Sequence, residues 1–143
     1  MDDIADALDQ MAGLVVRHLT DRRGLSMTAL ACLSRLNHDG PLRLTALADA
    51  EGVSQPSMSQ VVRRLEHQQI VRRFGDPEDG RASLVALTAT GQALLAQRSD
   101  DRRARLAELL ATLPAEDVTA LRLAMNVALP VLQRLAEAAR QNG

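Results

Sequence analysis

Two helix signals are separated by a single short turn, and this spacing limits the possible folds more than any other feature of the chain. We expect Thr45 to cap the first helix. Gly52 is suited to end it in the left-handed conformation, and Val53 supplies the apolar contact that accompanies such an ending. Ser54 can cap the next helix, in whose first turn Pro56 loses no hydrogen bond. Two helices joined so closely must cross steeply.

The second helix, from Gln55 to about His67, has two chemically different faces at 3.6 residues per turn. One face is apolar and must meet the core: Met58, Val61, Val62 and Leu65. The opposite face carries small hydroxyls, an amide and guanidinium groups: Pro56, Ser59, Gln60, Arg63, Arg64 and His67. Hydroxyls and arginine bind phosphates, and glutamine or arginine can bond base edges in pairs, so this face is suited to a DNA groove. The alternative is an ordinary solvated helix face.

Two β-type runs follow, Ile70–Phe74 and Ser83–Leu87, joined by a segment that contains Pro and Gly. We expect an antiparallel hairpin with Arg81 near its tip, and Asp79 is close enough in sequence to pair with Arg81 and hold its side chain extended. Such an arginine is suited to a narrow, electronegative minor groove. The alternatives are a surface loop of mixed charge, because surface ion pairs are weak, and a calcium loop. The calcium loop is disfavoured because Gly80 falls at the wrong position for it.

The order of these elements is helix, turn, helix, strand, charged hairpin and strand. That order is the layout of a winged helix-turn-helix, which places one helix in the DNA major groove and a loop beside it. The segments 52–66, 70–73, 76–81 and 87–91 together resemble the MarR family of dimeric winged-helix transcription regulators. The wing signature of Asp, Arg and then Leu-Thr-x-x-Gly carries most of this resemblance.

The resemblance implies an α+β, mostly α fold, with a winged helix-turn-helix over residues 26–90 of a single domain spanning 1–143. It implies helical dimerisation regions over 1–25 and 91–143. It also implies a repressor that binds double-stranded DNA, with a palindromic operator, and that is released by a small apolar or aromatic effector. The expected DNA-binding residues lie in the second helix, its cap and the wing: Ser54, Gln55, Pro56, Ser57, Ser59, Gln60, Arg63, Arg64, Arg73, Asp79 and Arg81.

The chain departs from the family pattern at two positions. Gln69 stands where the family commonly has a glycine after the recognition helix, and a left-handed conformation there costs about 1 kcal/mol. Glu78 stands where a basic residue is frequent, which weakens the expected contact of the wing with phosphate.

Composition is consistent with a closely packed helical protein of 143 residues. Phe74 is the only aromatic residue although 46% of the chain is hydrophobic, so Leu, Val, Met and Ala must fill the core. The net charge of −1 gives no global attraction to nucleic acid. Over residues 55–74, however, four arginines stand against Glu66, a local charge of +3.

Helical spacing of apolar residues predicts a first helix from Asp3 to Asp21. A second helix is expected from Met27 to about Asn37, capped by Ser26, with Leu42–Leu44 as a short third strand covering a sheet edge. Beyond the wing, Thr88 is expected to cap a helix that the charged stretch 98–105 interrupts.

A last helix is expected after Pro114, with a bend at Pro130. Its apolar stripe consists of Val118, Leu121, Met125, Ala128, Leu132 and Leu135. The terminal helices carry more apolar surface than a small winged domain can cover. Homodimerisation is expected to cover this surface, and twofold symmetry would match a palindromic operator.

Other functional classes are less well supported. Cys32 suggests either a redox-sensing thiolate or a small buried hydrophobe, and we favour packing because only Arg35 is a basic neighbour in sequence. His18, His38 and His67 lack ligand spacing, so we expect no metal and no cofactor. No catalytic constellation or phosphate-binding glycine loop is recognisable, so we expect no enzyme. A winged-helix protein-interaction adaptor remains an alternative.

No apolar run reaches the length of a membrane span, and the acidic N-terminus is unlike a signal region. We therefore expect a cytoplasmic protein without membrane contact.

Overall fold

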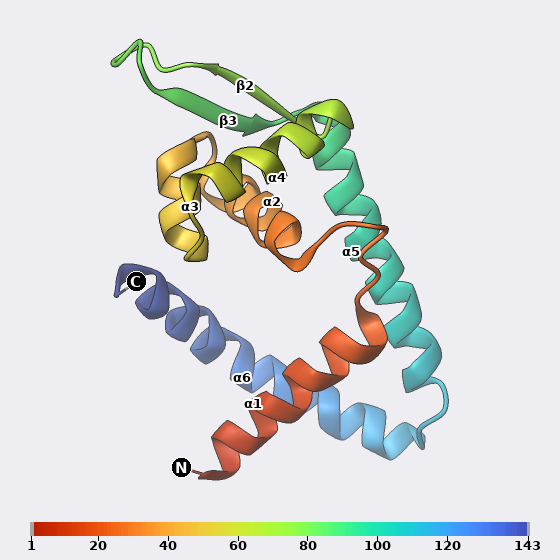
Figure 1. The fold of residues 1–143 in the computed structure, drawn as a ribbon. Helices are drawn as coiled ribbons and strands as arrows, with labels where there is room; N and C mark the ends of the chain where they lie inside the picture. The colour runs from red at the N-terminus through yellow and green to blue at the C-terminus, as the bar shows by residue number, and fades with distance from the viewer. Residues whose placement is uncertain (1, 143) are drawn as a thin grey trace. The chain divides into compact units, whose positions relative to one another are not determined.

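The computed structural model describes residues 2–142 (Figure 1), and the chain forms two units, one that ends at Arg102 and one that begins at Arg103. The elements are, in chain order, α1 (Asp2–Leu14), the π-helical η1 (Val15–Leu19), α2 (Met27–Asp39), β1 (Leu42–Arg43), α3 (Leu44–Glu51), α4 (Gln55–His67), β2 (Val71–Gly75), β3 (Ser83–Leu87), α5 (Ala89–Leu110) and α6 (Ala115–Gln141). None of the described helices combines the length and hydropathy that a bilayer crossing requires.

The turn between α3 and α4 has the predicted geometry. Gly52 is left-handed, with φ 65° and ψ 30°, and its N–H donates to carbonyls at the end of α3. The Ser54 side chain then accepts a hydrogen bond from the Ser57 N–H at 3.2 Å, which caps α4. The prediction that Thr45 caps α3 is wrong. Because β1 pairs as far as Arg43, the chain enters α3 directly, and Arg43 occupies the N-cap without a side-chain cap bond.

The wing is a three-stranded antiparallel sheet with strand order β1-β3-β2. β2 faces β3 in the register Val71↔Leu87, and β1 covers the other edge of β3 with Leu42 opposite Val85. The third strand is thus confirmed, although Leu44 belongs to α3. β2 begins one residue later than predicted, since Gln69 is left-handed with φ 62° and Ile70 still belongs to the turn.

The core joins α2, α3, α4 and the sheet. Its largest fully buried side chains are Leu33, Leu47, Met58, Leu65, Val62, Val85 and Cys32. The predicted inner face of α4 is confirmed, with Val61 only half-buried. Aliphatic and sulfur-containing side chains therefore fill this core, as the near absence of aromatic residues requires.

The N-terminal helix is less regular than predicted. Instead of one α-helix reaching Asp21, α1 gives way to a π-helical turn that ends at Leu19. The Thr20 hydroxyl donates to the Val15 carbonyl at 2.9 Å, five residues back, which matches the wider π turn. α2 begins as predicted, with Ser26 accepting from the Ala29 N–H at 3.1 Å, but ends at Asp39 rather than Asn37.

The start of α5 is fixed to the base of the wing by Thr88. Its hydroxyl donates toward the carbonyls of Gln69 (2.5 Å) and Ile70 (3.0 Å), and accepts from the Gly91 N–H at 3.0 Å. The Thr88 cap is thus confirmed. Gly91 is buried where a Cβ would overlap the Ile70 carbonyl oxygen and lie 3.1 Å from Leu87 Cδ2. A glycine is therefore required for α5 to lie this close to the turn.

The C-terminal helices are more continuous than predicted. α5 runs without interruption from Ala89 to Leu110, so the predicted break over 98–105 is wrong. A continuous helix is possible there because Arg98 turns inward and is buried, while charged neighbours such as Arg102 stay in solvent. α6 contains Pro130 and continues on both sides of it.

The close packing at Gly91 gives a stability prediction. Gly91→Ala places a methyl group against backbone that cannot yield, so we expect a loss of about 1–3 kcal/mol in the free energy of unfolding. Gly80→Ala is the matched control, since a Cβ at Gly80 meets no heavy atom within 4 Å. Urea midpoints measure both variants. A Gly91→Ala midpoint equal to that of Gly80→Ala would contradict the packing.

Candidate nucleic-acid interface

The α4 outer face, defined as the side opposite Met58, Val62 and Leu65, carries most of the candidate residues. Its exposed members are Gln55, Pro56, Ser57, Gln60, Arg63, Arg64 and His67, and Ser59 is half-buried. In the part of the chain that the structure describes, the guanidinium groups of Arg63 and Arg64 pair with no carboxylate. Hydroxyls, an amide and available cations therefore share one solvent-facing surface, as the sequence predicted.

Two serines at the start of this face bind each other. The Ser54 hydroxyl, which caps the helix, also donates to the Ser57 Oγ at 3.0 Å. Ser54 thus has a structural role, whereas the Ser57 hydroxyl keeps its own proton to donate. The four free N–H groups of a helix N-terminus also favour an anion such as phosphate near this end of α4.

The two arginines of β2 have different surroundings. Arg73 is half-buried, and its Nη2 lies 3.2 Å from the Glu66 carboxylate on α4. Its Nε is buried without a hydrogen-bond partner. Arg72 is exposed on the other side of the strand, with its guanidinium carbon 4.6 Å from the centre of the Phe74 ring. Of the two, the predicted site residue Arg73 is the one held by a protein carboxylate.

The tip of the wing differs from the prediction. Asp79 does not hold the Arg81 guanidinium; its Oδ1 accepts the backbone N–H of Arg81 at 3.1 Å. Asp79 also accepts the N–H of Ala82 through its carbonyl, at 3.0 Å. An aspartate side chain commonly accepts the backbone N–H two residues further on, which closes a turn. Asp79 therefore shapes the turn, and the exposed Arg81 side chain extends from it.

Sequence reasoning missed the ion pair at the base of the wing. Asp76 is 8% exposed, and its Oδ2 accepts from Arg43 Nε at 2.8 Å and Nη2 at 2.7 Å. Its Oδ1 accepts from the Glu78 N–H at 2.9 Å. The Glu78 N–H first, and then the Arg43 guanidinium, hold the pKa of Asp76 below its ordinary value. The separation of 33 positions along the chain explains why no local pattern revealed the pair.

A cavity of about 130 Å³ lies between the segment before α2 and the C-terminal half of α4. Its lining residues are Gly24, Leu25, Ser26, Ala29, Val61, Arg64, Leu65 and Gln68. A hollow of about 340 Å³ adjoins the same end of α4, lined by Arg63, Arg64, His67 and Gln68. Arg64 and Gln68 therefore line both spaces.

Cys32 lies fully buried in the core. Burial, assisted by the Glu51 carboxylate, raises the pKa of the Cys32 thiol to about 11, and Arg35 only partly opposes this. A protonated, inaccessible thiol is a poor nucleophile toward oxidants, which supports packing over redox sensing. Among the described residues, no three His, Cys, Asp or Glu side chains gather into a metal site.

Comparison with known proteins gives consistent matches. A family model described as MarR family matches residues 25–83. An uncharacterised HTH-type transcriptional regulator of Mycobacterium bovis is 34% identical over 108 residues, which cover 76% of each protein. An HTH-type transcriptional repressor of the same organism is 34% identical over 92 residues, covering 64% of this chain and 66% of that protein. The crystal structure of a Thermotoga maritima transcriptional regulator has the same fold, with a TM-score of 0.82, 20% identity, and coverage of 94% of this chain and 96% of that chain.

The lowered pKa of Asp76 predicts a pH-dependent contribution to stability. Because the folded pKa lies below the unfolded one, the contribution is complete above the ordinary carboxyl value of about 4. It is lost as the pH falls through the folded value. We expect Asp76→Asn to melt below the parent at pH 7, with the difference shrinking in acid. Glu78→Gln, a neighbouring exposed carboxylate, is the control, and a pH-independent gap between Asp76→Asn and the parent would refute this assignment.

The burial of Cys32 predicts slow thiol chemistry. We expect a disulfide reagent to label Cys32 in the native protein only as fast as the fold opens, and immediately in denaturant. Cys32→Ser should leave DNA binding insensitive to peroxide and lower the free energy of unfolding by about 1–3 kcal/mol, because a hydroxyl is buried. Rapid labelling of the native protein would instead favour a redox sensor.

Proposed function

This chain belongs to the MarR family of DNA-binding transcription regulators, and we propose that it is a sequence-specific repressor that binds a palindromic operator as a homodimer and is released by a small molecule. The α4 outer face carries this proposal. α4 buries Met58, Val62 and Leu65 and presents Gln60 and Arg63 to solvent on the opposite side. An amide and a guanidinium one turn apart on a major-groove helix can each bond a base edge in two places.

The other candidate residues have distinct expected roles. Ser57, Ser59 and Arg64 bind phosphates beside the groove. Gln55 and Pro56 lie at the N-terminus of α4, whose free N–H groups attract phosphate. Arg81 enters the adjacent minor groove from the wing turn that Asp79 shapes. Ser54 acts through the cap of α4, and Arg73 reaches phosphate only if it leaves Glu66.

Dimerisation is supported by apolar surface that the single chain leaves uncovered. None of the described residues of α6 is buried. Its exposed large hydrophobic residues are Leu121, Leu123, Val127, Leu129, Val131 and Leu135, of which Val127 reaches 77% exposure. A second copy of the chain can remove this surface from water, and the resulting twofold axis matches two inverted half-sites.

The cavity beside α4 supports release by a small molecule. A cavity of about 150 Å³ accommodates benzene, so a single ring suits the roughly 130 Å³ available here. Arg64 belongs to both the cavity wall and the α4 outer face, so an occupant that binds its guanidinium withdraws a cation from DNA. The repressor assignment is supported by the second Mycobacterium bovis relative, which is named an HTH-type transcriptional repressor.

Alanine substitutions test the groove-reading role. Gln60→Ala or Arg63→Ala should each cost about 1–3 kcal/mol on an operator selected from random duplex, and much less on unselected DNA. Arg105→Ala is the control for lost charge, because Arg105 pairs with Glu108 on α5 at 2.9 Å, outside the proposed interface. Titration of labelled duplexes measures all three.

A salt series separates the base contacts from the wing contact. Arg81→Ala should reduce the slope of log K against log salt by about one unit. Equal losses on selected and unselected DNA for Gln60→Ala would show that α4 touches only phosphate. Absence of salt-dependent binding in the parent would instead favour a protein-interaction adaptor.

A further inference from the structure

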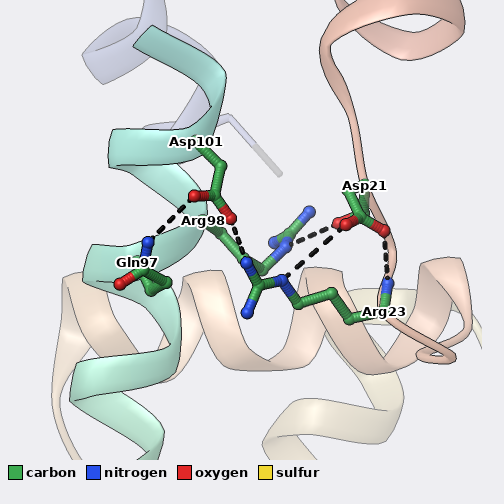
Figure 2. A network of polar contacts seen from close by, with 5 residues as sticks. All are labelled: Asp21, Arg23, Gln97, Arg98 and Asp101. Atoms are coloured by element: carbon green, nitrogen blue, oxygen red, sulfur yellow. Dashed lines mark hydrogen bonds and ion pairs between the residues drawn. The ribbon is translucent and has the colours of Figure 1, made fainter. Parts of the chain in front are cut away.

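The segment between η1 and α2 is attached to the middle of α5 by a polar network of Asp21, Arg23, Gln97, Arg98 and Asp101 (Figure 2). Arg98 Nε donates to the backbone carbonyl of Asp21 at 3.0 Å. The Asp101 carboxylate accepts from the Arg23 guanidinium through one oxygen and from the Gln97 amide, at 2.9 Å, through the other. Residues some 77 positions apart in the chain are joined in this way.

The contacts of this network are specific rather than incidental. Arg98 is only 9% exposed, which is rare for an arginine without a specific partner. Arg23 has φ 46°, and its backbone N–H donates to Asp21 Oδ1 at 2.9 Å. A non-glycine residue keeps a left-handed conformation only where the surrounding structure enforces it. The segment is therefore shaped to present the Asp21 carbonyl and the Arg23 guanidinium to α5.

This polar contact adds to the packing that already holds the start of α5 against the winged region. That packing consists of Thr88 and Gly91 at the start of the helix, and of Leu94 and Leu95, which pack against the core. Arg98 follows Gly91 by about 10 Å along the helix axis, at 1.5 Å per residue. Packing over the first two turns leaves the rest of the helix less constrained, whereas a polar attachment one turn further on helps to fix its direction. The segment leads straight into α2, which packs in the core with α4.

We propose that Arg23, Arg98 and Asp101 are positioning residues that determine which half-site spacing the dimer accepts. This inference rests on the proposed function, in which the C-terminal helices join two copies. The direction of α5 then sets the distance and rotation between the two α4 helices. One additional base pair moves a half-site by about 3.4 Å and rotates it by about 34°. A fixed α5 accepts one spacing, and a loosened α5 accepts several.

The test compares three duplexes: the palindrome that the parent selects from random DNA, and versions with one base pair added to or removed from its centre. We expect the parent to bind the altered duplexes at least tenfold more weakly. Arg98→Met, and Asp101→Asn as a milder change, should reduce this discrimination severalfold while binding of an isolated half-site is unchanged. Arg105→Gln on the same helix is the control and should keep the discrimination of the parent.

A charge exchange separates this role from general stability. Arg23→Asp should relax the spacing preference, and Arg23→Asp combined with Asp101→Arg should restore it, because the ion pair is re-formed in the opposite sense. Thermal melting and sedimentation verify that each variant is a folded dimer. Equal weakening of all three duplexes, unchanged discrimination in Arg98→Met, or failure of the double variant to restore it would overturn the inference. A parent that binds the half-site as a monomer would overturn the proposed function and this inference together.

Discussion

The burial of one face of α4 is the contact on which the rest of the structure depends. Met58, Val62 and Leu65 lie in a core without aromatic side chains, so the helices approach closely and α4 has a defined rotation about its axis. Once that rotation is fixed, Gln60 and Arg63 must point into solvent. The left-handed Gly52 and the Ser54 cap determine where α4 starts, and the core determines which side of it is available.

The remaining contacts position other elements around this helix. Asp76 and Arg43 join the base of the wing to the strand that precedes α3, while Thr88 joins the start of α5 to the turn after α4. Each attachment has a buried or half-buried polar side chain, Asp76 or Thr88, with specific partners, which fixes direction as well as distance. In the proposed dimer, the same attachments relate the recognition surface of one copy to that of the other.

The features that the sequence predicted well are those with local causes. A glycine that ends one helix and a serine that caps the next act within a few residues, and the periodicity of α4 reports its burial directly. The family pattern marked Gln69 as a position where a left-handed conformation would carry a cost, and in the structure Gln69 adopts that conformation with φ 62°. Thr45 was misassigned because pairing of β1 with β3, a tertiary contact, decides where α3 begins.

Side-chain partners could not be predicted in the same way. Arg98 lies in a run of charged residues that reads as a solvated helix face, yet it is buried against a carbonyl far away in the chain. Arg73 with Glu66, and Arg43 with Asp76, likewise pair only because folding places their elements together. In the wing, a backbone N–H near Asp79 binds its carboxylate in place of the predicted guanidinium.

The most direct test of the account is the selection of bound sequences from random duplex DNA by the parent protein. The account predicts an inverted repeat whose half-site centres are about 10–10.5 base pairs apart, or a multiple of that distance, with both half-sites protected equally. Enrichment of an asymmetric sequence, or no enrichment at all, would contradict a twofold dimer that reads DNA through α4.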